Sequence, residues 1–218
     1  MMNVEQARFN MIEQQIRPWD VLDQNVLDLL YKVRREEFVP AVYRGLAFSD
    51  LEVPIGAGER MMAPKMEARV LQEVAPKRTD RILEIGTGSG YMTALLAAMG
   101  AHVYSVEIDA ELKASGEAAL ARNDVRNVTL ELGDGARGWA KHGPYDVIVL
   151  TGSEPVLADE FLESLRVGGR LFAVVGDAPV MEARLVTRVA EGAVSARTLF
   201  ETVVAPLRNA PQPERFTF

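Results

Sequence analysis

Arg81-Ile-Leu-Glu-Ile-Gly-Thr-Gly-Ser-Gly-Tyr91 has the pattern of a short buried strand, three glycines at alternate positions and the start of an apolar helix. Glycines allow the backbone to approach a ligand closely, and the free N–H groups at a helix N-terminus face polar atoms. We therefore expect a nucleotide site between strand 81–85 and helix 91–99. A dinucleotide-binding loop requires a small residue where Tyr91 stands, which disfavours a NAD enzyme as the alternative.

Acidic residues follow the next two predicted strands. The run 101–106 alternates like a strand and is followed by Glu107, where α/β nucleotide sites place a carboxylate that accepts the ribose hydroxyls. A third strand, 128–132, precedes Asp134, which could accept the exocyclic amine of adenine. Each acid has an alternative interpretation, as a solvated strand end or an Asp-Gly turn. Their common place at the carboxyl ends of strands favours one shared ligand.

The remaining elements continue the alternation of helix and strand. We expect helices over 4–17, 23–34, 66–74 and 159–165, and further strands over 145–150, 170–175, 181–189 and 197–205, the last two as an antiparallel hairpin. The pattern predicts an α/β fold with a doubly wound, mostly parallel, seven-stranded sheet. Residues 1–65 are expected to form N-terminal helices and a substrate-side loop, and residues 66–218 the nucleotide-binding domain, within one compact unit.

Composition narrows the class of protein. The 218 residues are 48% hydrophobic and 25% charged, as in an ordinary soluble globule. The sequence shows no apolar run of membrane-spanning length and no signal peptide, so we expect a cytoplasmic protein without a membrane partner. There is no cysteine and there are only two histidines, which predicts no metal site. A net charge of −7 disfavours nucleic acid as a partner.

Several motifs together resemble a known family. The spacing E-x-G-x-G-x-G from Glu84 to Gly90 resembles motif I of S-adenosylmethionine-dependent methyltransferases. Over nearly its whole length the chain is similar to the protein-L-isoaspartate O-methyltransferase family. The segments that carry this resemblance most specifically are Val33-Arg-Arg-Glu-Glu-Phe-Val-Pro40 and Pro54-Ile-Gly56 with Ala63-Pro64; further matching segments include Gly133-Asp-Gly135 and Ala205-Pro-Leu207.

The resemblance implies a Rossmann-like sheet that binds S-adenosyl-L-methionine and leaves S-adenosyl-L-homocysteine as product. The acceptor would be the free carboxyl of isoaspartyl residues in damaged proteins, which the enzyme repairs as a monomer or weak dimer. A carboxylate is already ionised at neutral pH, so the reaction needs no general base. The residues expected to bind the cofactor are Glu84, Gly86, Thr87, Gly88, Ser89, Gly90, Tyr91, Glu107, Ile108, Asp134, Gly135 and Thr151.

The sequence departs from the family pattern on the acceptor side. The family loop has approximately T-I-S-x-P, and here the same positions are Arg60-Met-Met-Ala-Pro64, so that Met62 stands at the serine position. A thioether cannot donate a hydrogen bond, and a lost donor to a charged group costs about 1.5–3 kcal/mol. Arg60 or Lys65 could supply the missing donor, although both could equally be solvated loop charges.

A second departure follows the fourth predicted strand, at Thr151-Gly-Ser-Glu-Pro155. Ser153 or Glu154 could reshape the acceptor pocket or merely cap the next helix. Two alternative functions therefore stay open: a methyltransferase for a different acceptor, and a cofactor-binding module without turnover. Methylation of a nucleobase is not expected, because Leu150 to Pro155 lacks the [D/N]-P-P-[F/Y] run that holds an exocyclic amine.

Overall fold

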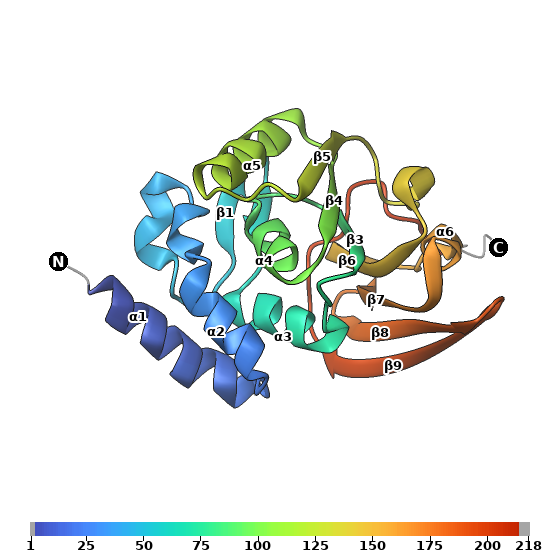
Figure 1. Cartoon of the computed structure of the whole chain (residues 1–218), viewed down its shortest axis with the longest axis horizontal. Coiled ribbons are helices and arrows are strands. Elements are labelled where there is room, and N and C mark those ends of the chain that lie inside the picture. Colours follow the sequence, from blue (N-terminus) through green and yellow to red (C-terminus); the bar gives the residue numbers. More distant parts are fainter. Residues whose placement is uncertain (1–2, 214–218) are drawn as a thin grey trace.

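A computed structural model describes residues 3–213 and places one seven-stranded sheet at its centre (Figure 1). The strand order is β5-β4-β3-β6-β7-β8-β9. Strands β3 to β7 pair in parallel, and β8 and β9 are antiparallel. The bounds are β3 Arg81–Ile85, β4 His102–Glu107, β5 Val128–Leu132, β6 Tyr145–Glu154, β7 Leu165–Asp177, β8 Val180–Ala190 and β9 Ala193–Glu201. The predicted fold class is confirmed.

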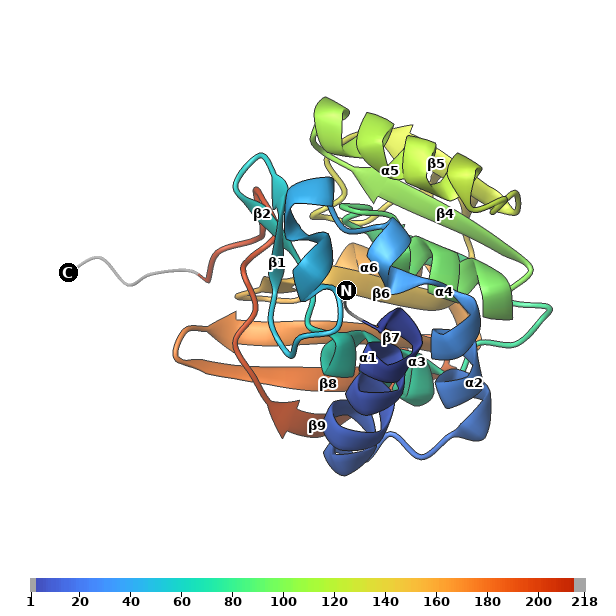
Figure 2. The same ribbon diagram turned by 90° about the vertical axis from the view of Figure 1, so that its left-hand side faces the viewer.

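Apolar strands lie at the middle of the sheet because both of its faces are covered. The face toward α3 (Pro64–Val74), α4 (Tyr91–Met99) and α5 (Ala110–Arg122) also packs against the N-terminal helices in one continuous core (Figure 2). The other face carries the short α6 (Asp159–Glu163) and Trp139. The strand order reverses between β4 and β6 on either side of β3, and ligands of such folds bind at that reversal.

The N-terminal region contains the two predicted helices and, within residues 41–65, more regular structure than the sequence predicted. The first helix is α1 (Val4–Met11), which continues as a π-helix over Ile12–Ile16 and a 3-10 turn over Arg17–Trp19. The second is α2 (Gln24–Lys32), which begins where the side chain of Asp23 caps it. Where the sequence predicted the substrate-side loop, residues 41–65 contain a 3-10 helix, Ala41–Leu46, and a separate hairpin of β1 (Val53–Gly56) and β2 (Glu59–Met61).

The C-terminal part differs from the prediction in one important respect. The last strand ends at Glu201, not at Ala205, and the chain then leaves the sheet edge. Residues 202–209, here called the strap, run back to the end of β6, where the Ser153 amide donates to the Ala205 carbonyl at 2.9 Å. The Leu207 amide donates to the Ser153 carbonyl, also at 2.9 Å. The Thr202 amide still donates to the Met181 carbonyl of β8 at 3.1 Å, but from Val204 onward the strap bonds to β6, which sequence pattern alone does not distinguish.

No helix within residues 3–213 combines the length and apolar character that a bilayer span requires. The same residues contain no group of three or more acidic or histidine side chains arranged to hold a metal ion.

Candidate functional site

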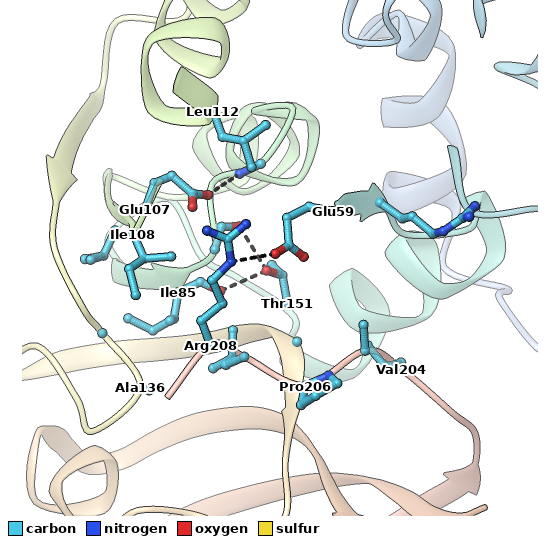
Figure 3. Close-up of a pocket in the computed structure, with 18 of the residues that line it drawn as sticks. Glu59, Ile85, Glu107, Ile108, Leu112, Ala136, Thr151, Val204, Pro206 and Arg208 are labelled. Carbon is cyan, nitrogen blue, oxygen red and sulfur yellow. Dashed lines mark hydrogen bonds and ion pairs between the residues drawn. The ribbon is translucent and has the colours of Figure 1, made fainter. Parts of the chain in front are cut away.

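A pocket opens at the carboxyl ends of β3, β4 and β6, closed on one side by the β1–β2 hairpin and on another by the strap (Figure 3). Of the residues that the sequence assigned to the cofactor, seven line this pocket: Gly86, Gly88, Glu107, Ile108, Asp134, Gly135 and Thr151. Two of the three acceptor-side candidates, Arg60 and Met62, also line it. The fold therefore brings residues from five separate parts of the chain to one cavity.

The loop after β3 has a backbone that only glycine adopts readily. Gly86 has φ +94°, and a Cβ atom there would lie 2.2 Å from the hydroxyl oxygen of Thr151. That hydroxyl lies 2.9 Å from the carbonyl oxygens of both Ile85 and Gly86. A Cβ atom at Gly88 would lie 3.0 Å from the Ile55 side chain of the hairpin. Side chains at these two positions would collide with Thr151 or crowd Ile55, so bare backbone borders the pocket here, as a cofactor cradle requires.

Two carboxylates border this space and retain hydrogen-bonding capacity. Glu107 accepts from the amide of Gly88 at 2.8 Å and from the amide of Asp109 at 3.0 Å. Asp134 accepts from the amide of Ala136 at 3.1 Å and from the side chain of Asn209 at 2.9 Å. A carboxylate offers about four acceptor positions, so each group can still receive a ligand hydroxyl or amine. Backbone donors fix their orientation before any ligand binds.

Five of the predicted cofactor residues do not line the pocket: Glu84, Thr87, Ser89, Gly90 and Tyr91. The Glu84 side chain is fully buried beneath the loop, where the hydroxyls of Thr93 and Ser105 donate to it. Burial raises the pKa of Glu84 to about 8, although these hydroxyls oppose the shift. The Thr87 hydroxyl lies 2.6 Å from that of Ser105 in the same network. These side chains support the glycine loop from within the core.

The acceptor-side cations have different surroundings. Lys65 lies outside the pocket lining, where it pairs with Asp50 at 2.8 Å and its ammonium lies 5.1 Å from the centre of the Trp19 ring. Arg60 lines the pocket, and its one hydrogen bond within residues 3–213 is a long contact of 3.5 Å to the Glu52 carbonyl. Among these residues no carboxylate forms an ion pair with Arg60. Of the two cations, Arg60 is the one available to a ligand.

In the departure after the fourth strand, Thr151 and Gly152 line the pocket, whereas Ser153 and Glu154 do not. The Ser153 hydroxyl donates to the Val204 carbonyl at 2.8 Å and so holds the strap. Glu154 is fully buried and accepts from the amide of Ala158 at 3.3 Å. Of the two interpretations of this segment, a local structural role agrees with the geometry. Residues 204–208 of the strap also line the pocket. In the sequence, the Ala205-Pro-Leu207 motif was the feature that could have indicated this.

Comparison with known proteins agrees with this arrangement. The family model "Protein-L-isoaspartate(D-aspartate) O-methyltransferase (PCMT)" matches residues 6–212. The chain belongs to this family. A protein-L-isoaspartate O-methyltransferase from Gloeobacter violaceus is 37% identical over 203 residues, which cover 93% of this chain and 99% of the relative. One from Xanthomonas axonopodis pv. citri is 35% identical over 206 residues, covering 94% and 91%.

Solved structures show the same fold. A Plasmodium falciparum protein-L-isoaspartate O-methyltransferase, crystallised with S-adenosyl-L-homocysteine, superposes with a TM-score of 0.79 at 18% identity, covering 95% of this chain and 99% of that one. The family model and the curated relatives confirm the expected family, and with it the expectation of a methyltransferase that uses S-adenosyl-L-methionine. The pocket fits that cofactor, since the glycine cradle and the two carboxylates lie together at the strand ends.

Proposed function

We propose that this PCMT-family protein transfers a methyl group from S-adenosyl-L-methionine to the free α-carboxylate of isoaspartyl residues in proteins and peptides. The observation that carries this acceptor is Arg60, a pocket-lining residue whose guanidinium has no ion-pair partner among residues 3–213. A carboxylate that enters the pocket meets this cation on the hairpin. The names of the relatives, which specify protein isoaspartate, support the same acceptor.

The cofactor supplies an electrophilic methyl group on a sulfonium, so the protein has mainly to bind and align the reactants. In this proposal Glu107 accepts hydrogen bonds from the ribose hydroxyls, and Asp134 accepts one from the adenine amine. Gly86 and Gly88 place only backbone beside the bound molecule. Arg60 holds the acceptor carboxylate in its ionised form. Because that carboxylate is itself the nucleophile, no side chain has to remove a proton.

Met62 occupies the position of the family serine and lines the same pocket. Its thioether gives an apolar wall without a donor, so the hydrogen bond that a serine would provide has to come from elsewhere. Arg60, two residues earlier on the hairpin, can provide it and carries a full charge as well. The partners of this protein would be the isoaspartyl-containing proteins that it methylates. Its monomeric or weakly dimeric state and its cytoplasmic location stay predictions.

The test is transfer of labelled methyl from the cofactor to an isoaspartyl peptide, compared with the same peptide containing ordinary aspartate. We expect methylation of the isoaspartyl peptide alone. Arg60→Ala should raise the KM for the peptide by about 10- to 100-fold, because a lost charge-assisted hydrogen bond costs about 1.5–3 kcal/mol. Lys65→Ala is the matched control and should leave this KM unchanged, since Lys65 lies outside the pocket lining.

Met62→Ser gives a second readout on the same assay. A serine hydroxyl at this position should raise kcat/KM in the native background and partly compensate for the loss in Arg60→Ala. Equal transfer to both peptides, or none to either, would show that the acceptor is different. An unchanged KM in Arg60→Ala would remove Arg60 from the acceptor site.

A further inference from the structure

Arg208, on the strap, joins the two sides of the pocket mouth. Its Nε donates to the Glu59 carboxylate at 2.8 Å, and its Nη2 donates to the Ala57 carbonyl, also at 2.8 Å. Its Nη1 lies 3.3 Å from the carboxylate of Asp109. Figure 3 shows the guanidinium between Glu59 and the wall that carries Glu107. One side chain therefore contacts the hairpin tip and the element that follows β4.

The hairpin has little support of its own. It forms a separate two-stranded sheet, and isolated hairpins are at best marginally stable in water. Its turn, Gly56 to Gly58, has three consecutive residues with positive φ. The hairpin nevertheless carries Arg60 and leads directly into Met62, so its position determines where the acceptor-side residues lie. The contacts from Arg208 hold its tip.

Asp109, the other partner of Arg208, belongs to residues 107–112, here called the cofactor wall. Asp109 caps helix α5 by accepting from the amides of Glu111 and Leu112 at 3.0 and 3.1 Å. The amide of Asp109 donates to the Glu107 carboxylate. Leu112, on the first turn of the capped helix, lines the pocket. Through Asp109, Arg208 is thus fixed to the same segment that presents Glu107.

We propose that Arg208 is a positioning residue that holds the acceptor hairpin against the cofactor wall, and that breaking its contacts is a step in the release of S-adenosyl-L-homocysteine. The Arg208 side chain is 38% exposed, and exposed ion pairs are weak and screened by salt. The contacts are therefore able to open during each catalytic cycle. The proposal depends on the cofactor and not on the identity of the acceptor.

The first experiment measures S-adenosyl-L-homocysteine dissociation from the full-length protein by stopped flow. Arg208→Ala should accelerate release by about two- to fivefold, as expected for the loss of exposed contacts, and Arg208→Lys, which keeps one ion pair, should fall between it and the native protein. Native release should become faster as the salt concentration rises from about 0.05 to about 0.5 M, whereas release from Arg208→Ala should change little. If Arg208 only supported the fold, the release rate of Arg208→Ala would depend on salt as strongly as that of the native protein.

Matched variants separate the mechanism from a general effect of lost charge. Arg166→Ala removes a similarly exposed arginine, which pairs with Asp146 away from the pocket, and should leave the release rate unchanged. Glu59→Gln should accelerate release, and the double variant with Arg208→Ala should be no faster than Arg208→Ala alone. Native-like release from Arg208→Ala, or additive effects of the two substitutions, would overturn the proposal. Because no acceptor is present, failure of the isoaspartyl assay would leave this result unaffected.

Discussion

The two ends of the acceptor hairpin are held by the same kind of group in opposite surroundings. At its base Arg35 is 1% exposed and donates to the carbonyl of Met62 at 2.7 Å, to that of Ala47 at 3.0 Å and to the carboxylate of Glu67. At its tip Arg208 makes comparable contacts while 38% exposed. The base is inaccessible to water and salt, and the tip is open to both.

The difference is one of desolvation. A buried ion pair contributes little compared with an apolar substitute, but the loss of one partner leaves an uncompensated charge and costs about 3–5 kcal/mol. An exposed pair contributes about 0–1 kcal/mol, because water competes for both groups. Arg35 therefore holds Met62 firmly, whereas thermal motion can break the contacts between Arg208 and the hairpin tip. The hairpin combines a rigid base with a tip that can open.

The largest expected effect comes from breaking the base. Glu67→Leu leaves the Arg35 guanidinium charged in the core, since arginine does not lose its proton, and should lower the free energy of unfolding by about 3–5 kcal/mol. Urea denaturation measures this change. Asp124→Asn, which removes an exposed pair with Arg126, is the control and should change it by less than about 1 kcal/mol. A similarly small loss in Glu67→Leu would mean that base and tip do not differ.

A smaller effect concerns Glu154, a buried carboxylate without an ion-pair partner in the described part of the chain, residues 3–213. Burial raises the pKa of Glu154 from 4.5 to about 7, and the Ala158 amide only partly opposes this. The folded state then holds a proton that the unfolded state loses between pH 4.5 and 7, so stability should fall as the pH rises through this window. The full shift corresponds to about 3 kcal/mol.

Urea denaturation across this pH range should therefore show a decline in the native protein that Glu154→Gln reduces. The variant keeps an acceptor for the Ala158 amide but has no proton to lose. Parallel pH profiles for the two proteins would show that Glu154 does not titrate in this way. Such a result would limit the contrast between buried and exposed groups to the arginine pairs.

The smallest effect on stability belongs to the tip. Arg208→Ala should change the free energy of unfolding by less than about 1 kcal/mol, while amide hydrogen exchange of the hairpin, residues 53–61, becomes faster. Mass spectrometry of the exchanged protein resolves this segment from α3. If exchange accelerated equally in α3, whose Glu67 belongs to the base, the two ends would not be independent.

The sequence predicted the sheet well because its strands carry strong local signals. The glycine run after Ile85 and the apolar run from Tyr145 indicate buried parallel strands whatever lies around them. Residues 202–205 of the strap were assigned to the last strand, since Val203 and Val204 favour extended backbone in either place. Only the hydrogen bonds of Ser153 with Val204, Ala205 and Leu207 place this segment beside β6, and with it Arg208 at the pocket.

In the candidate site, too, motif spacing predicted some features and only the tertiary structure decided others. Motif spacing predicted that Gly86, Glu107 and Asp134 would meet, because the carboxyl ends of parallel strands share one edge. Spacing could not tell Arg60 from Lys65, which are five residues apart in the same loop. The distinction arises from neighbours distant in sequence: Asp50 and Trp19 engage Lys65, and no comparable partner engages Arg60 among residues 3–213.

The amino-acid sequence alone determined the family, the order of the strands along the chain and the glycine loop that borders the pocket, since each depends on local backbone preference and residue spacing. Tertiary structure decided which charges are buried and which are exposed. Arg35 and Arg208 are chemically identical, and the energy of their contacts differs because packing removes water from one and leaves it beside the other.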